Sequence, residues 1–159
     1  MTVVEEYDPD LDAWTPRPPL PAVNCEASAV TLNGIVYVIG GDDNYHANSS
    51  TMAYDPNTET WATLPGPSLY DNGAVVLGGS VFAFGGNTGG GTTSSTIQFA
   101  PGMTTWMPQP AMPTVRQTLA AVAIGDRAYA IGGHNDGGAI FASVEVFGLP
   151  RRLYAHRRN

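Results

Sequence analysis

The sequence predicts an all-β protein made of repeated antiparallel sheets, and three observations lead to this prediction. A short, largely apolar run that ends in a double glycine occurs at residues 35–41, 80–86 and 127–133. Each run follows a two-residue link of the kind that closes tight hairpins. A tryptophan also stands seven residues after an aromatic residue three times, at Trp14, Trp61 and Trp106. The period of about 45 residues is typical of repeat proteins.

The apolar runs are best explained as inner strands. Residues 35–39 are apolar throughout, and the run is too short for a helix, which needs about ten residues or more. The glycines that follow suit a positive φ or a close approach of two backbones. Before each run lies a strand of small apolar residues, and the pair is joined by a link that favours a primed turn. These first strands are expected at 27–32, 74–77 and 119–124, and the links are Asn33-Gly34, Gly78-Gly79 and Gly125-Asp126.

An outer pair of strands completes each repeat. Its first strand ends in an aromatic residue, twice followed by Asp-Pro, which favours a turn. Its second strand surrounds the tryptophan, and a proline-rich loop follows because proline cannot donate to a sheet. The aromatic strands are expected at 3–7, 51–54, 96–99 and 143–147. Four antiparallel strands per repeat, stacked around an axis, are the blades of a β-propeller.

The combined pattern resembles the kelch repeat over residues 3–148. It includes the small-apolar strand, the Asn-Gly turn, Ile-Tyr-Val-Ile-Gly-Gly in its local variants, Tyr-Asp-Pro and the tryptophan. The resemblance divides the chain into repeats at about 1–47, 48–94 and 95–142, a partial repeat at 143–148, and a basic tail at 149–159. It also implies that six aromatic residues pack between neighbouring blades, as core. These are Tyr7, Tyr54, Phe99, Trp14, Trp61 and Trp106.

The repeats add up to about three blades, whereas propellers usually have four to eight. Such an arc leaves an apolar blade face bare at each end. Three outcomes stay open. Two copies can form a homodimer that completes a six-bladed ring, with the outer strand pair of one copy beside the inner pair of the other. The chain can instead be a truncated piece of a larger kelch protein, or the arc can stand alone.

The composition excludes several partner classes. There are 14 acidic side chains, no lysine and seven arginines, four of which lie in residues 151–159. An acidic body repels nucleic acid and anionic membranes, so we expect neither as a partner. The single cysteine, Cys25, fits a reducing compartment, and no secretion signal is evident, so the sequence predicts a cytoplasmic protein. We expect no metal and no cofactor.

Loops at one face of the blades are the candidate binding site. In proteins with this resemblance, the loops after the double glycines and those after the tryptophans emerge on the same face and bind ligands. Asn24, Asp71 and Arg116 each lie ten residues past a tryptophan, where kelch domains often carry an arginine that grips acidic groups of a partner. The candidate partner-binding residues are Asp42, Asp43, Asn44, Tyr45, His46, Tyr70, Asp71, Asn72, Arg116, Gln117, His134, Asn135 and Asp136.

The resemblance implies a non-catalytic module for protein–protein interaction. The alternative is a sugar-active kelch-type enzyme similar to sialic-acid mutarotases. Copper oxidases that resemble galactose oxidase need a Tyr–Cys cross-link and two histidine ligands, and no tyrosine in the sequence is marked as a partner of Cys25. The sequence shows no serine nucleophile elbow and no paired-carboxylate motif, so no catalytic residue is predicted.

Overall fold

The computed structural model describes residues 2–44 and 46–149, and every regular element within them is a β-strand. Thirteen strands form four antiparallel sheets, in the orders β1-β2, β3-β4-β5-β6, β7-β8-β9-β10 and β11-β12-β13. The strands are β1 (Val4–Asp8), β2 (Ala13–Arg17), β3 (Ser28–Leu32), β4 (Ile35–Ile39), β5 (Ser50–Asp55), β6 (Thr60–Pro65), β7 (Gly73–Leu77), β8 (Ser80–Phe84), β9 (Thr96–Phe99), β10 (Met107–Gln109), β11 (Ala120–Ile124), β12 (Arg127–Ile131) and β13 (Val144–Gly148). The predicted all-β fold of successive antiparallel sheets is confirmed, and two of the four sheets are four-stranded units.

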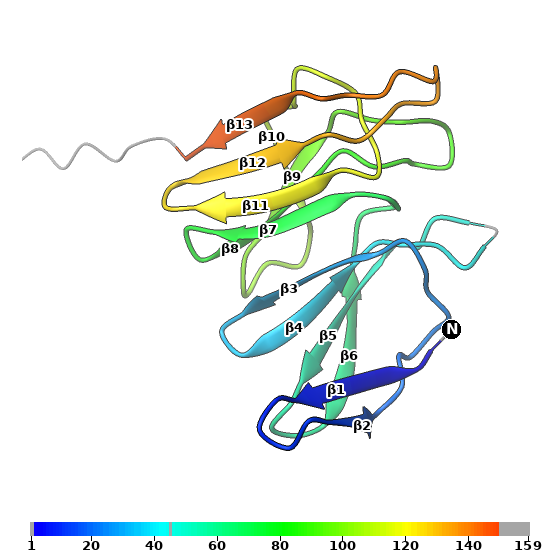
Figure 1. Cartoon of the computed structure of the whole chain (residues 1–159), viewed down its shortest axis with the longest axis vertical. Helices are drawn as coiled ribbons and strands as arrows, with labels where there is room; N and C mark the ends of the chain where they lie inside the picture. The colour runs from blue at the N-terminus through cyan, green and yellow to red at the C-terminus, as the bar shows by residue number, and fades with distance from the viewer. Residues whose placement is uncertain (1, 45, 150–159) are drawn as a thin grey trace, which may run out of the picture.

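The four sheets follow one another in chain order, with β1-β2 at one end and β11-β13 at the other (Figure 1). The first strands of the three larger sheets, β3, β7 and β11, contact one another in sequence and form the inner side of the arc. The two-residue turns lie along one edge of the arc, and the long loops after β4, β8 and β12 lie along the opposite edge (Figure 1). Within the described residues, no helix is long and apolar enough to cross a bilayer.

The inner hairpins form as predicted because their turn residues adopt the required backbone. Asn33 and Gly34 have φ values of 53° and 79°, as a type I′ turn demands, and Gly78 and Gly79 repeat this with 57° and 77°. In the third hairpin only Gly125 has a positive φ, of 61°. The ladders are then continuous, with Leu32 opposite Ile35 and Leu77 opposite Ser80.

Packing between sheets places large side chains against small ones. Leu32, Tyr37 and Ile39 of the second sheet are buried together with Val81 and Ala83 of the third. The same arrangement recurs one sheet later, where large residues of β7 and β8 pack against alanines of the last sheet. That cluster contains Val75, Leu77, Phe82 and Phe84 with Ala128 and Ala130. In these inner hairpins, large residues of one sheet therefore pack against smaller residues of the next.

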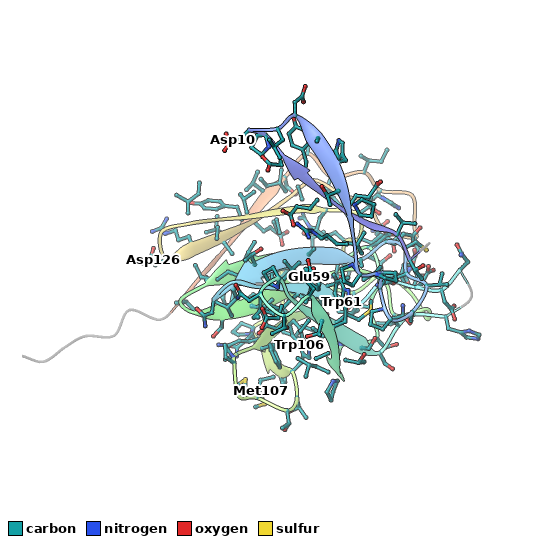
Figure 2. All side chains as sticks on the ribbon, turned by 90° about the horizontal axis from the view of Figure 1, so that it is seen from below. Asp10, Glu59, Trp61, Trp106, Met107 and Asp126 are labelled. Atoms are coloured by element: carbon teal, nitrogen blue, oxygen red, sulfur yellow. The ribbon has the colours of Figure 1, made fainter. Side chains whose placement is uncertain are left out.

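The aromatic pairs form as the repeat predicts, but two of the six residues are not core. Tyr54 and Phe99 are buried, and their tryptophans Trp61 and Trp106 are half-buried near the middle of the molecule (Figure 2). Each of these tryptophans donates its indole N–H to the preceding sheet or to the residue just after it. Trp61 donates to Pro18 O, directly after β2 (2.9 Å), and Trp106 donates to Thr51 Oγ1 in β5 (3.2 Å).

Tyr7 and Trp14 correct the sequence-based prediction. Their rings contact each other at 5.1 Å, yet they are 42% and 65% exposed. The first sheet consists of the β1-β2 hairpin alone, whose tip at Asp10 projects from the body (Figure 2). With no inner strand pair beside them, these two aromatics have little to pack against.

At the opposite end of the arc, the strand expected at residues 143–147 forms as β13. β13 pairs with β12 over its full length, from Ile131 opposite Val144 to Arg127 opposite Gly148. The edge of β12 is therefore occupied, and the joint expected for a homodimer, with β1 of one copy beside β12 of another, is blocked while β13 stays in place. Leu149, assigned to the tail from the sequence, packs against the core of the last two larger sheets. Residues 150–159 of that tail lie outside the described residues.

Candidate functional site

The loop edge of the arc is built from two kinds of segment. The lead-in segments, residues 24–27, 69–72 and 116–119, directly precede β3, β7 and β11, and each lies beside the loop that follows a double glycine. A single antiparallel bridge joins them in every repeat: Cys25 with Asp42, Tyr70 with Asn87, and Gln117 with His134. These bridges extend each inner hairpin past its glycines, so they hold the two loop types side by side as the sequence predicts for one face.

The double glycines fix the loop edge of one sheet onto the next. Gly41 donates its backbone N–H to Leu69 O (2.7 Å), and Gly86 donates to Arg116 O (2.9 Å). All the glycines concerned have positive φ, between 60° and 94°, and a Cβ on Gly40 would lie 2.0 Å from Leu69 O. Glycine is required here because the backbones of adjacent sheets touch.

These bonds also correct the predicted equivalence of three lead-in residues. Leu69, not Asp71, occupies the place of Arg116, because the loop after Trp61 is shorter than the loop after Trp106. Asp71 is equivalent to Glu26 and Thr118, and all three share the left-handed backbone with φ values of 55°, 56° and 52°. Counting residues from the tryptophan does not identify equivalent lead-in residues, because the length of the loop varies. The hydrogen bonds from the double glycines identify them instead.

Arg116 is fully buried rather than presented at the loop face. Its guanidinium donates to Glu145 Oε1 (2.6 Å), Ser143 Oγ (3.1 Å) and Gly132 O (2.9 Å), and it lies 5.1 Å from the ring centre of Phe141. Every one of these partners belongs to the same sheet and its loop. The residue therefore holds the last sheet together, and in this structure it is not positioned to grip an acidic group of a partner.

A groove of about 560 Å³ lies between the loop after β4 and the loop after β8. Three residues chosen from the sequence line it together, Asp42, Asn44 and His46, and Tyr70 joins them from the next lead-in. Tyr45, the remaining candidate in this loop, lies outside the described residues. Sequence analysis did not identify the other lining residues, which are Ala47, Ser68, Thr88 and Gly89.

A second cluster ties the last two loops together. Gln117 accepts a hydrogen bond from Asn87 Nδ2 (2.7 Å) and contacts His134 Nε2 (3.1 Å) through its amide nitrogen. Asp136 accepts the backbone N–H of Thr92 (2.7 Å), and this hydrogen bond lowers the pKa of its carboxyl. Gln117, His134 and Asp136 thus lie together, and their hydrogen bonds are made to each other and to the neighbouring loop. Asn135 accepts the backbone N–H of Ala139 within its own turn.

The remaining candidates lie apart from the groove. Asp71 and Asn72 line a separate hollow of about 370 Å³ at the inner side of the arc, together with Glu26. Asn72 is buried, and Ser28 Oγ donates to its carbonyl. Repulsion by Asp71 raises the pKa of Glu26, with burial and Asp42 adding to the effect. Asp43 caps its own loop by accepting the backbone N–H of His46 (2.8 Å).

The loop edge is acidic around Tyr70. Burial raises the pKa of the Tyr70 phenol, and the charges of Asp136, Asp42, Glu26 and Asp71 raise it further. Because Arg116 is buried against Glu145, it does not offset these carboxylates at the surface. The sequence signal for Glu26 was available in principle, since it stands one residue after Cys25 as Asp71 stands after Tyr70, but the shifted register concealed it.

Cys25 should react slowly with iodoacetamide in the folded protein. Its thiol donates to Asp42 Oδ1 (2.6 Å), and this hydrogen bond, burial and the Asp42 charge all raise the pKa of Cys25. Less thiolate is then present at a given pH, and only the thiolate is nucleophilic. We expect Asp42→Asn to speed alkylation several-fold at mildly alkaline pH, measured by mass spectrometry of the intact chain. Asp10→Asn, at the tip of the first hairpin, is the matched control, and equal rates in all three proteins would contradict this account.

Comparison with known proteins matches the repeat directly. A family model described as the kelch motif matches residues 24–68, which cover the lead-in and all four strands of the second sheet. Kelch-like protein terF of Aspergillus terreus is 32% identical over 68 residues, which are 40% of this chain and 15% of that protein. Kelch-like protein 21 of Rattus norvegicus is 35% identical over 71 residues, or 42% of this chain and 12% of that protein. Kelch-like protein 33 of Homo sapiens is 42% identical over 67 residues, or 40% and 12%.

The chain thus matches only a small part of each of these longer relatives. The matched motif coincides with one complete four-stranded sheet, and the same strand order, glycines and tryptophan recur in the sheet that follows. Residues 24–68 of this chain therefore carry a kelch motif, and the chain is similar there to kelch-like proteins.

Proposed function

We propose that the chain is a protein-interaction module that binds an extended partner segment in the groove between the loops after β4 and β8. The observation that carries this proposal is the groove itself, which lies between loops of two adjacent sheets. Asp42, Asn44 and His46, which the sequence singled out in the first loop, line it together with Tyr70. The kelch-like relatives support a role in binding protein partners. Cys25 is a free thiol, and the module is proposed to work in the reducing cytoplasm.

The partner segment is proposed to be basic. Asp42 lines the groove, and the charges of four nearby carboxylates raise the pKa of the Tyr70 phenol. The described lining contains one basic side chain, that of His46, which is exposed at the rim close to Asp43. An arginine or lysine of the partner would therefore meet a complementary field, and the Tyr70 ring would offer a face for a cation.

Peptide binding measured by fluorescence anisotropy tests this proposal. Three short labelled peptides serve as probes: alternating Arg-Gly, alternating Glu-Gly and alternating Ser-Gly. We expect the Arg-Gly peptide to bind best and to weaken as salt is raised, because exposed charges are screened. Asp42→Asn should weaken that binding by about two- to fivefold, the scale of one exposed ion pair, and Tyr70→Ala should weaken it at least as much.

The controls separate the site from its charge preference. Asp10→Asn removes the same charge at a remote hairpin tip and should leave binding unchanged (Figure 2). Equal binding of the three peptides, with loss in Tyr70→Ala, would keep the groove as a site and overturn the basic partner. No effect of either groove variant on any peptide would overturn the groove as the binding site.

A further inference from the structure

We propose that the next repeat controls one wall of the groove, and that this wall keeps its shape only while His134 is uncharged. The wall consists of Thr88 and Gly89, which line the groove from the loop after β8. The control acts through a polar relay, a chain of hydrogen bonds that runs from Asn87 through Gln117 to His134. The consequence for peptide binding rests on the function proposed above, whereas the relay itself concerns the loops alone.

Asn87 gives this wall its shape. Its side-chain oxygen Oδ1 accepts the backbone N–H groups of Gly89 (2.9 Å) and Gly91 (3.3 Å), which folds the start of the loop back on itself. Asp42 shapes the opposite wall in the same way, by accepting the backbone N–H of Asn44 (3.1 Å). Asn87 and Asp42 are equivalent, since each forms the bridge that joins its loop to a lead-in segment. Both walls are thus turns closed by one side-chain oxygen.

The orientation of the Asn87 amide decides every later bond of the relay. Because its oxygen is used by two N–H donors, its nitrogen Nδ2 points away from the loop and donates to Gln117 Oε1 (2.7 Å). The Gln117 amide is then fixed as well, with its nitrogen Nε2 facing His134 Nε2 (3.1 Å) and Asp136 Oδ1 (3.3 Å). An amide nitrogen only donates, so His134 Nε2 accepts, and the imidazole carries its single proton on Nδ1.

Burial and a neighbouring carboxylate hold the relay in this single arrangement. Asn87 and Gln117 are 7% and 9% exposed, so water poorly replaces a hydrogen bond that they lose. Asp136 Oδ1 accepts from both amide nitrogens, at 3.3 Å each, and an ionised carboxylate cannot donate in return. The pKa of Asp136 is lowered, chiefly by the backbone N–H of Thr92, so this acceptor persists well below neutral pH.

A proton added to His134 Nε2 reverses the last bond of the relay. Two N–H donors then face each other at the contact with Gln117, and either amide can turn over only by leaving another buried group unpaired. The imidazolium is also attracted to the Asp136 carboxylate, whose Oδ1 holds both amide nitrogens, so it competes with them for that oxygen. Histidine changes its charge between about pH 5 and 8, and the wall should therefore loosen as the pH falls through that range.

The other charged groups near the relay are few. Residues 85–95 contain no acidic or basic side chain, and Arg116, next to Gln117, is paired within its own sheet. Burial and the nearby carboxylates raise the pKa of Tyr70, which keeps its phenol uncharged. His134 is thus the group of the relay whose charge is expected to change near neutral pH.

Nuclear magnetic resonance of the full chain tests the relay without any ligand, at about pH 7.5 and about pH 5.5. At the higher pH, the imidazole nitrogen shifts should place the proton of His134 on Nδ1. The backbone amide shifts of Gly89 and Gly91 should titrate with the same midpoint as the imidazole. Their hydrogen exchange, corrected for the intrinsic effect of pH, should be about fivefold faster at the lower pH, the scale of one buried hydrogen bond.

Two variants of similar size separate the relay from general loosening. His134→Gln keeps an acceptor that does not titrate, so the two glycine amides should stay protected at both pH values. Gln117→Glu keeps the oxygen for Asn87 but replaces the donor by an acceptor, so the wall should be loose at the higher pH and tighten when His134 is protonated. A residue that serves only the stability of the fold would not reverse the pH response. If Gln117→Glu does not fold, His134→Gln alone decides.

His46→Asn is the matched control for these variants. It removes the histidine of the opposite wall, and the two glycine amides should respond to pH as they do in the wild-type protein. A proton on His134 Nε2 at the higher pH, or glycine amides that do not respond to pH, would overturn the relay. A response that persists unchanged in His134→Gln would assign it to another group and overturn the role of His134.

The labelled Arg-Gly peptide then shows whether the relay acts on the groove. This measurement uses proteins that carry His46→Asn, because a charged His46 would repel the peptide directly. The affinity should fall by about fivefold from the higher to the lower pH, and adding His134→Gln should remove most of that fall. A peptide that binds at neither pH would overturn the proposed groove function and leave the relay to the amide result. An affinity independent of His134, with glycine amides that do respond, would overturn the control of binding.

Discussion

Replacing Gly40 by alanine is expected to lower the free energy of unfolding by about 3–5 kcal/mol, which is large for a single methyl group. The added Cβ would lie 2.0 Å from Leu69 O, in the backbone of the next sheet. Either the two sheets must separate, with loss of the bond from Gly41 to Leu69 and of the buried cluster below it, or the hairpin must distort. The unfavourable positive φ of 65° adds about 1–2 kcal/mol.

Gly34 provides the matched control for this prediction. Its φ is 79°, similar to that of Gly40, but a Cβ there would meet no atom within 4 Å. Gly34→Ala should therefore cost only the backbone term of about 1–2 kcal/mol. Urea unfolding followed by circular dichroism measures both variants. If the two substitutions cost the same, contact between the sheets does not explain the double glycines.

Replacing Arg116 by alanine is expected to lower the free energy of unfolding by about 3–5 kcal/mol, because it leaves a buried carboxylate without its ion-pair partner. The Glu145 side chain is only 14% exposed, and besides Arg116 it is bound by Thr114, through both its backbone N–H and its hydroxyl. The same substitution would leave Gly132 O and Ser143 without the guanidinium. Replacing an exposed arginine that serves only to bind a partner would change the free energy of unfolding little. Chemical denaturation therefore distinguishes a structural role of Arg116 from a binding role.

The neighbouring sheet supplies the compensating variant. At the places of Arg116 and Glu145 it carries the apolar residues Leu69 and Ile97, since Ile97 lies opposite Ala83 as Glu145 lies opposite Ala130. The double variant Arg116→Leu with Glu145→Ile should recover most of the stability lost in either single variant, since well-packed apolar residues can replace a buried ion pair. It should also bind the Arg-Gly peptide as the wild-type protein does. A double variant no more stable than Arg116→Leu alone would show that the pair is not the main contribution.

Most of the fold followed from the sequence because its signals are local. The inner hairpins depend on two adjacent turn residues, such as Asn33 and Gly34, and on runs whose burial follows from their composition. The aromatic partners Tyr54 and Trp61 meet because a tight turn places residues seven apart on opposite strands. Repetition then confirmed each local signal with further copies.

The candidate site followed from the sequence only in part. Asp42, Asn44, His46 and Tyr70 were identified as loop residues, and they do line one groove. Ser68 and Thr88 were missed because serine and threonine in loops carry no distinctive signal. Arg116 and Asp71 were equated because both stand at the same distance from a tryptophan, and loop length, which the sequence does not align by itself, separates them.

The sequence by itself determined the repeating unit, its four strands and the edge along which its long loops lie, because each depends on neighbouring residues and on turn chemistry. The tertiary structure alone decided which copies of the unit have a neighbour. Trp14 and Trp61 share one pattern, yet one is exposed and the other half-buried, and Ile124 and Leu77 differ in the same way. Burial depends on what lies on the other side of a sheet, and no stretch of a single repeat encodes that.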